Sequence, residues 1–336
     1  MVWKTAAVVV VVAILVVSGC YVLSKPPAGE ADKDKETDFA AGRGGAKAVP
    51  FDAKRAMGYL EAICKIGPRI SGTEGMKKQQ ELIEKHFKDL DAKVRYQKFT
   101  ARQVSRRQPT EMANMIVSWH PDRERRVILC SHYDTRPIAD QEDDRRNWEK
   151  PFVSANDGGS GVALLMELGN HVKDLDSRAG IDFVFFDGEE YIRDRDSDRY
   201  FLGSEQFADE YKKSKTKTKY VAAILLDMVA GKEAHFPGEM NSLVKAGGLV
   251  ENVWAIAKEL KVKEFEQEPG PEIQDDHLPL NRAGIPAIDV IDLTTSGRQI
   301  FNYPHWHKLS DTPENCSGET MAQVARVLGV WLQRVK

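Results

Sequence analysis

The sequence predicts an α/β fold: a single three-layer domain in which a mixed, mostly parallel sheet carries helices on both faces. Short runs rich in Val, Ile, Leu and Phe, typical of strands buried on both faces, alternate with longer helical patterns along the chain. The 336 residues are 42% hydrophobic and 29% charged, values that are ordinary for a globular protein with an adequate core. Strands that alternate with helices imply a sheet covered on both sides.

The first 49 residues are expected to precede the folded domain. Residues 6–17 contain only Ala, Val, Ile and Leu, and Ser18-Gly19-Cys20 follows, so residues 1–23 are typical of a signal peptide or membrane anchor, lipobox-like at Cys20. Apolar character resumes at residues 21–23, which leaves an uncleaved membrane-spanning helix as the alternative to a lipidated cysteine. Both interpretations export the rest of the chain and tether it to a membrane. Residues 24–49, rich in Pro, Gly, Ala and charged residues, are expected to form a flexible linker.

The folded domain is expected to span residues 50–336. Strong strands are predicted over 126–131, 181–187, 221–227 and 287–292, and weaker ones, which indicate an antiparallel edge, over 94–99 and 114–119. Helical periodicity predicts helices over 75–90, 159–172, 203–211, 249–260 and 319–335. Either Ser71 or Thr73 is expected to cap the first of these helices.

Charge and cysteine content argue against two classes of protein. The formal net charge is -3, with 48 Lys and Arg against 51 Asp and Glu, so the chain has no overall positive field that would draw it onto nucleic acid. The four cysteines form no CxxC pair or short metal-type spacing, which disfavours a cysteine zinc site. Cys130 is expected in a core strand, and the disulfide state of Cys64, Cys130 and Cys316 stays open.

Acidic residues and histidines follow the predicted strands at the point where each strand ends. They are His132 and Asp134 after the first strong strand, Glu189 and Glu190 after the second, Asp227 at the end of the third, and His307 beyond the fourth. Asp157 lies in a glycine-rich turn at residues 154–161, just before a helix. Ligands of such sheets bind at the carboxyl ends of the strands. Because zinc takes nitrogen and carboxylate ligands, the sequence predicts a zinc-type site at this edge.

Six motifs, in this order and combination, resemble the M28 family of zinc aminopeptidases and, within that fold, the glutaminyl-peptide cyclotransferases. They are His132-Tyr133-Asp134, Asn156-Asp157, Phe185-Phe186-Asp187-Gly188-Glu189-Glu190, Leu225-Leu226-Asp227, Gln274-Asp275-Asp276-His277-Leu278-Pro279 and Trp306-His307. The resemblance covers roughly residue 50 to the C-terminus. It implies the zinc aminopeptidase-like (phosphorylase/hydrolase-like) fold, with one zinc ion bound by Asp157, Glu190 and His307.

The resemblance also implies a role for the residues around the zinc. Glu189 would be the general acid/base, and Asp227 and Asp275 would form a hydrogen-bonded acidic network beside it. Trp306 would wall the substrate pocket, while His277 is expected either in that pocket or in a structural role. His132 and Asp227 match the positions that complete a second zinc site in the aminopeptidases, with Asp157 bridging the two ions.

The motif Asp275-Asp276-His277 favours cyclisation of N-terminal Gln to pyroglutamate with release of ammonia, because many aminopeptidases of this fold have Ser-Asp-His there. The alternatives are a two-zinc aminopeptidase that hydrolyses N-terminal residues and a non-catalytic binding ectodomain. The expected partners are the N-termini of peptides or proteins. Arg195 stands about where animal cyclotransferases have a pocket tryptophan, and Leu280 where many have Phe, so we expect the substrate pocket to differ from theirs.

Overall fold

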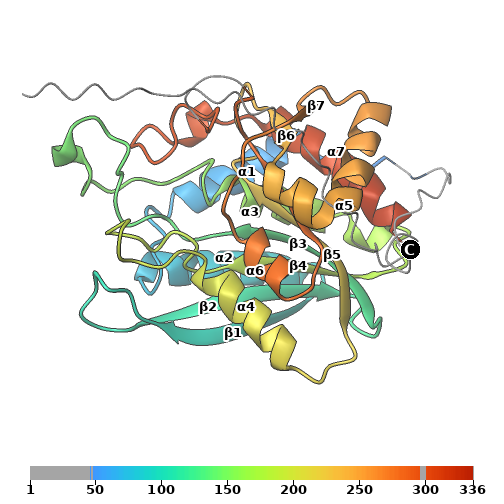
Figure 1. Ribbon diagram of the computed structural model, residues 1–336, viewed down its shortest axis with the longest axis horizontal. Coiled ribbons are helices and arrows are strands. Elements are labelled where there is room, and N and C mark those ends of the chain that lie inside the picture. The colour runs from blue at the N-terminus through green and yellow to red at the C-terminus, as the bar shows by residue number, and fades with distance from the viewer. Residues whose placement is uncertain (1–45, 47, 296–299, 336) are drawn as a thin grey trace, which may run out of the picture. The chain divides into compact units, whose positions relative to one another are not determined.

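A six-stranded sheet forms the centre of the protein in the computed structural model, which describes residues 46, 48–295 and 300–335 (Figure 1). Its strand order is β1-β2-β4-β3-β5-β8. The strands β4 (Gly180–Phe186), β3 (Arg125–His132), β5 (Lys219–Asp227) and β8 (Ala287–Ile291) pair in parallel, whereas β1 (Lys93–Ala101) and β2 (Thr110–Trp119) add an antiparallel edge. The predicted mixed, mostly parallel sheet is confirmed. The predictions for residues 1–23 and for most of the linker lie outside the described residues.

Helices cover both faces of this sheet. On one face, Ile128 and Cys130 of β3 belong to a buried cluster that includes residues of α4 (Leu202–Lys213) and α6 (His277–Arg282). On the other face, Leu129 belongs to the main core, together with residues from five helices. These are α1 (Ala53–Cys64), α2 (Glu74–Asp89), α3 (Ser160–Gly169), α5 (Met240–Glu259) and α7 (Gly318–Arg334). Successive side chains of a strand point to opposite faces, so one strand supplies both cores.

Smaller elements complete the fold. The short strands β6 (Phe236–Gly238) and β7 (Phe265–Pro269) pair in parallel as a separate two-stranded sheet, and three short 3-10 helices lie in the connections. The latter are η1 (Arg145–Asn147), η2 (Val172–Asp174) and η3 (Pro313–Asn315). Among the described residues, no helix has both the length and the apolar character needed to cross a membrane.

The structure differs from the predicted helices at three places. The helices α1 and α6 were not predicted, and α5 begins at Met240, about nine residues before the predicted start. The Glu239 side chain accepts hydrogen bonds from the backbone N–H groups of Asn241 and Ser242 and so caps α5. Ala246 departs from helical geometry within this helix, just before two glycines. Because glycine weakens a helix, the sequence pattern becomes helical only beyond that point.

The connections between strands bring the ends of β4, β3 and β5 together. The chain passes from β3 to β4, which lies on one side of β3 in the sheet, and then crosses to β5, which lies on the other side of β3. The carboxyl ends of three neighbouring parallel strands therefore lie in a row, at the edge where such sheets bind ligands.

Thr73, rather than Ser71, caps α2. The Ser71 hydroxyl instead donates to Asp187 Oδ1 at 2.7 Å, beyond the end of β4.

Candidate active site

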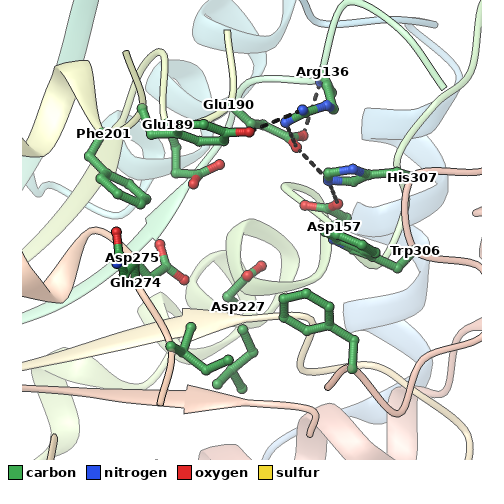
Figure 2. Close-up of a pocket in the computed structure, with 14 residues that line it drawn as sticks. Arg136, Asp157, Glu189, Glu190, Phe201, Asp227, Gln274, Asp275, Trp306 and His307 are labelled. Carbon is green, nitrogen blue, oxygen red and sulfur yellow. Dashed lines mark hydrogen bonds and ion pairs between the residues drawn. The ribbon is translucent and has the colours of Figure 1, made fainter. Parts of the chain in front are cut away.

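The three residues expected to bind zinc meet at this edge of the sheet. His307 Nε2 lies 2.9 Å from Glu190 Oε2 and 3.3 Å from Asp157 Oδ2. Glu190 follows β4, Asp157 precedes α3, and His307 comes from the long loop after β8. All three side chains are buried, with exposed fractions of 5% or less. Figure 2 shows them on one side of a pocket, which we call the metal wall.

The two residues expected to complete a second metal position lie beside them. His132 Nε2 is 3.2 Å from Asp157 Oδ1 and 3.3 Å from Asp227 Oδ1. Asp157 therefore lies between two histidines and offers one carboxylate oxygen to each. Both predicted ligand sets are brought together around this shared aspartate, so the positions alone are compatible with either one or two ions.

The arrangement fits zinc. The possible ligand atoms of His132, Asp157 and Glu190 all lie within 4.8 Å of one another. Tetrahedral zinc with bonds of about 2.0–2.2 Å would separate neighbouring ligand atoms by about 3.3–3.6 Å, close to the spacings seen here. Within the described part of the chain, His132 Nε2, Asp157 Oδ2 and Asp227 Oδ1 are buried and have no hydrogen-bond partner. A bound cation would satisfy these atoms.

A tight turn presents Asp157. Gly158 has a φ of +70°, and a Cβ added there would lie 2.5 Å from the Asp134 carbonyl oxygen, so only glycine fits. The Asp311 carboxylate accepts the backbone N–H of Asn156 at 2.8 Å and that of Asp157 at 3.2 Å. Asp311 was not predicted as a site residue, because it follows no strand or recognisable motif.

The Asp134 carboxylate holds the backbone of the adjacent residues Glu189 and Glu190. Asp134 accepts the backbone N–H of Glu189 at 3.1 Å through Oδ1 and that of Glu190 at 3.2 Å through Oδ2. These bonds fix the turn after β4, so that Glu190 contacts His307 while Glu189 lies across the pocket in Figure 2. One glutamate is thus placed for metal and its neighbour for proton transfer.

Glu189 and Asp275 line the opposite side of the same pocket, and Asp227 lies between them and the metal ligands; we call these three residues the acidic wall. Burial raises the pKa of Glu189 well above its usual value; the Asp275 charge adds to this and the His132 charge opposes it. Burial and the charges of Asp227 and Asp276 likewise raise the pKa of Asp275. The neighbouring Asp276 has a pKa raised by burial to about 7. These carboxyl groups hold protons at a pH where ordinary carboxylates have lost them.

The pocket between the walls has a volume of about 230 Å³ and is partly lined by aromatic rings. Trp306 lines it as expected, with its ring stacked on that of His307 at a centroid distance of 4.0 Å. Sequence reasoning did not identify Tyr200, Phe201 and Phe301, which also line it. The remaining lining residues are Arg136, Ile273, Gln274 and Ile291.

His277 does not line this pocket, which favours the structural role among the two that were expected. It is fully buried at the start of α6, with Nε2 3.2 Å from Glu239 Oε1 and Nδ1 3.9 Å from Asp289 Oδ2. Glu239 caps α5, so His277 connects two helices. Its role here is structural.

Unusual backbone conformations gather at the site. Of the seven non-glycine residues with positive φ in the described part of the chain, Ser154, Phe201, Met228 and His307 lie in the pocket or within three residues of a predicted ligand. Such conformations are uncommon for residues with a Cβ and cluster at functional sites. The sequence carries no signal for them.

Comparison with known proteins agrees with this geometry. The model of peptidase family M28 matches residues 114–332. The crystal structure of a glutaminyl cyclase from Fimbriiglobus ruber is 50% identical, with a TM-score of 0.82 over 86% of this chain and 97% of that one. A Zn-dependent exopeptidase from Parabacteroides distasonis is 30% identical, with a TM-score of 0.79 over 85% of this chain and 99% of that one.

A glutaminyl-peptide cyclotransferase-like protein from Mus musculus is 24% identical over 309 residues, which are 84% of this chain and 76% of the mouse protein. The family model alone covers more than half of the chain, and it includes every predicted metal ligand. The predicted resemblance is confirmed: the chain belongs to peptidase family M28.

Proposed function

We propose that this protein is a zinc-dependent glutaminyl-peptide cyclotransferase, an acyltransferase that converts the N-terminal Gln of peptides to pyroglutamate and releases ammonia. The observation that carries the proposal is the acidic wall. Glu189 and Asp275 face the metal wall across one small pocket, with Asp227 between, so proton-handling carboxyl groups and metal ligands meet the same substrate. The similarity to the glutaminyl cyclase of Fimbriiglobus ruber supports the same activity.

The reaction closes a five-membered lactam. The substrate's α-amine attacks the carbonyl carbon of its side-chain amide, a new C–N bond forms, and the bond to the amide nitrogen breaks to release ammonia. Zinc held by Asp157, Glu190 and His307 would supply Lewis-acid polarisation of that carbonyl. Glu189 takes a proton from the attacking amine and gives it to the departing nitrogen. Asp227 and Asp275 tune Glu189, and the aromatic side chains exclude water.

The pocket suits this substrate. A volume of about 230 Å³ accommodates one side chain folded back on its own amine, but not a length of extended peptide. Trp306 and Phe301 pack together at an angle of 37°, with ring centroids 4.3 Å apart, and offer an apolar surface to the glutamine methylenes. The acidic wall offers hydrogen-bond partners and a proton acceptor to the α-amine, an arrangement that favours a free N-terminus.

A two-zinc aminopeptidase is the second candidate. The observation that favours it is the pairing of His132 with Asp157 and Asp227 at 3.2 and 3.3 Å, together with the likeness to the exopeptidase from Parabacteroides distasonis. Two ions in these positions would activate a water molecule, with Glu189 as its base. Asp275, which the hydrolytic reaction does not need, favours cyclisation with one ion.

Mass spectrometry of two peptides separates the candidates. One peptide begins with Gln and the other with Leu, and each is incubated with the zinc-loaded protein. We expect the Gln peptide to lose ammonia while the Leu peptide stays intact. Removal of the first residue from either peptide would instead establish the aminopeptidase, and unchanged peptides would contradict both enzymatic functions.

We also propose that the chain is exported and tethered to a membrane through its N-terminal segment. The support is the run of Ala, Val, Ile and Leu over residues 6–17, followed by Cys20 in a lipobox-like context. Metabolic labelling with a radioactive fatty acid tests the lipid anchor. Label that is lost in Cys20→Ala supports lipidation, whereas a membrane-bound and unlabelled wild type supports an uncleaved helix.

A further inference from the structure

A buried aspartate outside the predicted site connects two arginines to a metal ligand. Asp140, which is 8% exposed, follows the β3 strand by eight residues. Its Oδ1 lies 2.9 Å from Nδ1 of His307. Its Oδ2 accepts hydrogen bonds from Arg136 Nη2 at 2.9 Å and from Arg195 Nε at 2.7 Å.

The same short segment contacts a second ligand. The backbone N–H of Arg136 donates to Glu190 Oε1 at 3.0 Å, and the Arg136 guanidinium lies 3.7 Å from Glu190 Oε2. Residues 136–140 therefore contact both Glu190 and His307, two of the three ligands on the metal wall. Figure 2 shows Arg136 beside these two side chains.

The position of the hydrogen on His307 follows from these contacts. A carboxylate accepts hydrogen bonds and cannot donate them, so Nδ1 of His307 carries a hydrogen toward Asp140. With a metal ion bound on the other side of the ring, Nε2 would offer it a lone pair. Nε2 is the atom that faces Glu190 and Asp157. A histidine that donates its other ring N–H to a carboxylate is fixed in tautomer and orientation and becomes a more basic metal ligand.

Two guanidinium groups contact the buried Asp140 carboxylate on the side away from His307, those of Arg136 and Arg195. Arg136 is itself buried, whereas the side chain of Arg195 is 46% exposed. Arg195 is the residue expected where animal cyclotransferases have a pocket tryptophan, yet it does not line the pocket. Its contact with Asp140 gives it a different task.

We propose that Asp140 is a positioning residue that orients His307 for zinc, and that Arg195 supports it as an ionic partner. The inference rests on the zinc-dependent function proposed above. It concerns the affinity of the site for metal and applies to both cyclisation and hydrolysis. Asp140 itself touches neither the ion nor the substrate.

The test is the zinc affinity of Asp140→Asn, measured by competition with a chromophoric chelator. The amide can still accept a hydrogen bond from His307 but carries no charge and opposes one guanidinium with its own N–H groups. We expect the dissociation constant for zinc to rise about 10- to 100-fold, the usual effect of losing a partner of a ligand. Asp144→Asn is the matched control, because Asp144 lies in the same connection and binds Arg146 at an exposed site. Its zinc affinity should equal that of the wild type.

Two substitutions at the half-exposed Arg195 provide a second test in case the Asp140→Asn protein misfolds. Arg195→Gln should weaken zinc binding about two- to fivefold, as expected for a half-exposed ion pair, and Arg195→Lys should restore part of that loss. If metal-free Asp140→Asn melts at a much lower temperature than the wild type, the zinc affinities of the two Arg195 variants are the test of the proposal. Wild-type affinity in Asp140→Asn, or in Arg195→Gln where Asp140→Asn does not fold, would overturn the proposal. A wild type that binds zinc but leaves Gln peptides unchanged would refute the proposed function alone.

Discussion

The two walls of the pocket are built from the same residue types and yet differ in charge. On the metal wall, the close contacts of Asp157 with the rings of His132 and His307 overcome the effect of burial and lower its pKa. On the acidic wall, Glu189 and Asp275 have few donors, and burial raises their pKa values. Glu190 is the exception on the metal wall, since burial and the charge of Asp157 raise its pKa. Partners, and not residue type, decide which carboxyl group binds metal and which carries a proton.

Buried carboxyl groups behind the acidic wall extend this difference. Asp289 of β8 is fully buried, and neither of its side-chain oxygens has a hydrogen-bond partner among the described residues. Burial and the charge of Asp275 raise its pKa. By contrast, Asp182 of β4 is buried beside Arg126, with 2.6 Å between Arg126 Nη2 and Asp182 Oδ1, and also accepts from Tyr220. Beyond the pocket itself, a buried acid without partners likewise has a raised pKa, whereas Asp182 has a charged partner.

Removal of the metal should have the largest effect, because it eliminates the function of one wall entirely. Dialysis against a strong chelator should abolish turnover of a Gln peptide, and addition of zinc should restore it. Circular dichroism should show that the metal-free protein keeps its helices and sheet, since the core lies outside the site. Turnover by protein whose metal content is shown to be zero would contradict the role of the metal wall.

Glu189→Gln removes the proton-transfer group of the acidic wall and leaves the ligands of the metal wall unchanged. We expect kcat to fall roughly 100- to 10,000-fold, the range for loss of a general acid/base, while zinc affinity stays close to that of the wild type. Glu205→Gln is the control, because Glu205 forms its ion pairs with Arg199 and Arg282 on the surface of α4. A Glu189→Gln protein that keeps wild-type kcat would refute the assignment of this residue.

The dependence of kcat on pH tests the raised pKa of Glu189. The carboxylate accepts a proton from the amine only when ionised, so kcat should fall about tenfold per pH unit below the pKa of Glu189. Because burial raises that pKa, the acid limb should lie above the ordinary glutamate value of about 4.3. The measurement uses kcat, which reports the enzyme–substrate complex, so titration of the free peptide amine does not contribute. A kcat that is constant down to pH 5 would contradict the raised pKa.

Asp289→Asn should have the smallest effect. A carboxyl group whose pKa is raised by folding stabilises the protein fully below its unfolded pKa of about 3.9 and loses that contribution as pH rises through the folded pKa. The neutral amide of Asn does not lose stability in this way. Between pH 4 and pH 8 the free energy of unfolding of the variant should therefore rise by on the order of 1 kcal/mol relative to that of the wild type, measured by urea unfolding. Asp182→Asn provides the contrast, because it removes a partner of buried Arg126 and should be destabilising at both pH values.

The sequence was informative where chemistry and periodicity coincide. His132, Glu190 and Asp227 were identified because each ends or follows an apolar strand, and the order of parallel strands then brings them together. Asp140, Phe201 and Asp311 could not be predicted, because they lie in connections without periodicity and act through contacts with residues distant in sequence. His307 was identified from its motif, but its left-handed backbone and its contact with Asp140 were not.

The same limit explains the errors in the fold. The helix α6 has six residues, too few for a periodic pattern, so the buried position of His277 could not be distinguished from a pocket position. In α5, Gly247 and Gly248 obscured the first half of the helix. The four parallel strands were predicted within about two residues, because a strand that is buried on both faces leaves a continuous apolar run.

The contact of Asp311 with the turn at Asp157 has a consequence for how the protein matures. These residues are separated by 154 positions in the chain, and His307 and Asp140 by 167. Contacts between such distant residues form late in folding, because a long loop must close before they are made. A ribosome-bound chain that has not yet released residues 307–311 has no complete ligand set, however well its first strands are formed. The complete ligand set therefore forms only once the C-terminal part of the chain has folded against the turn at Asp157.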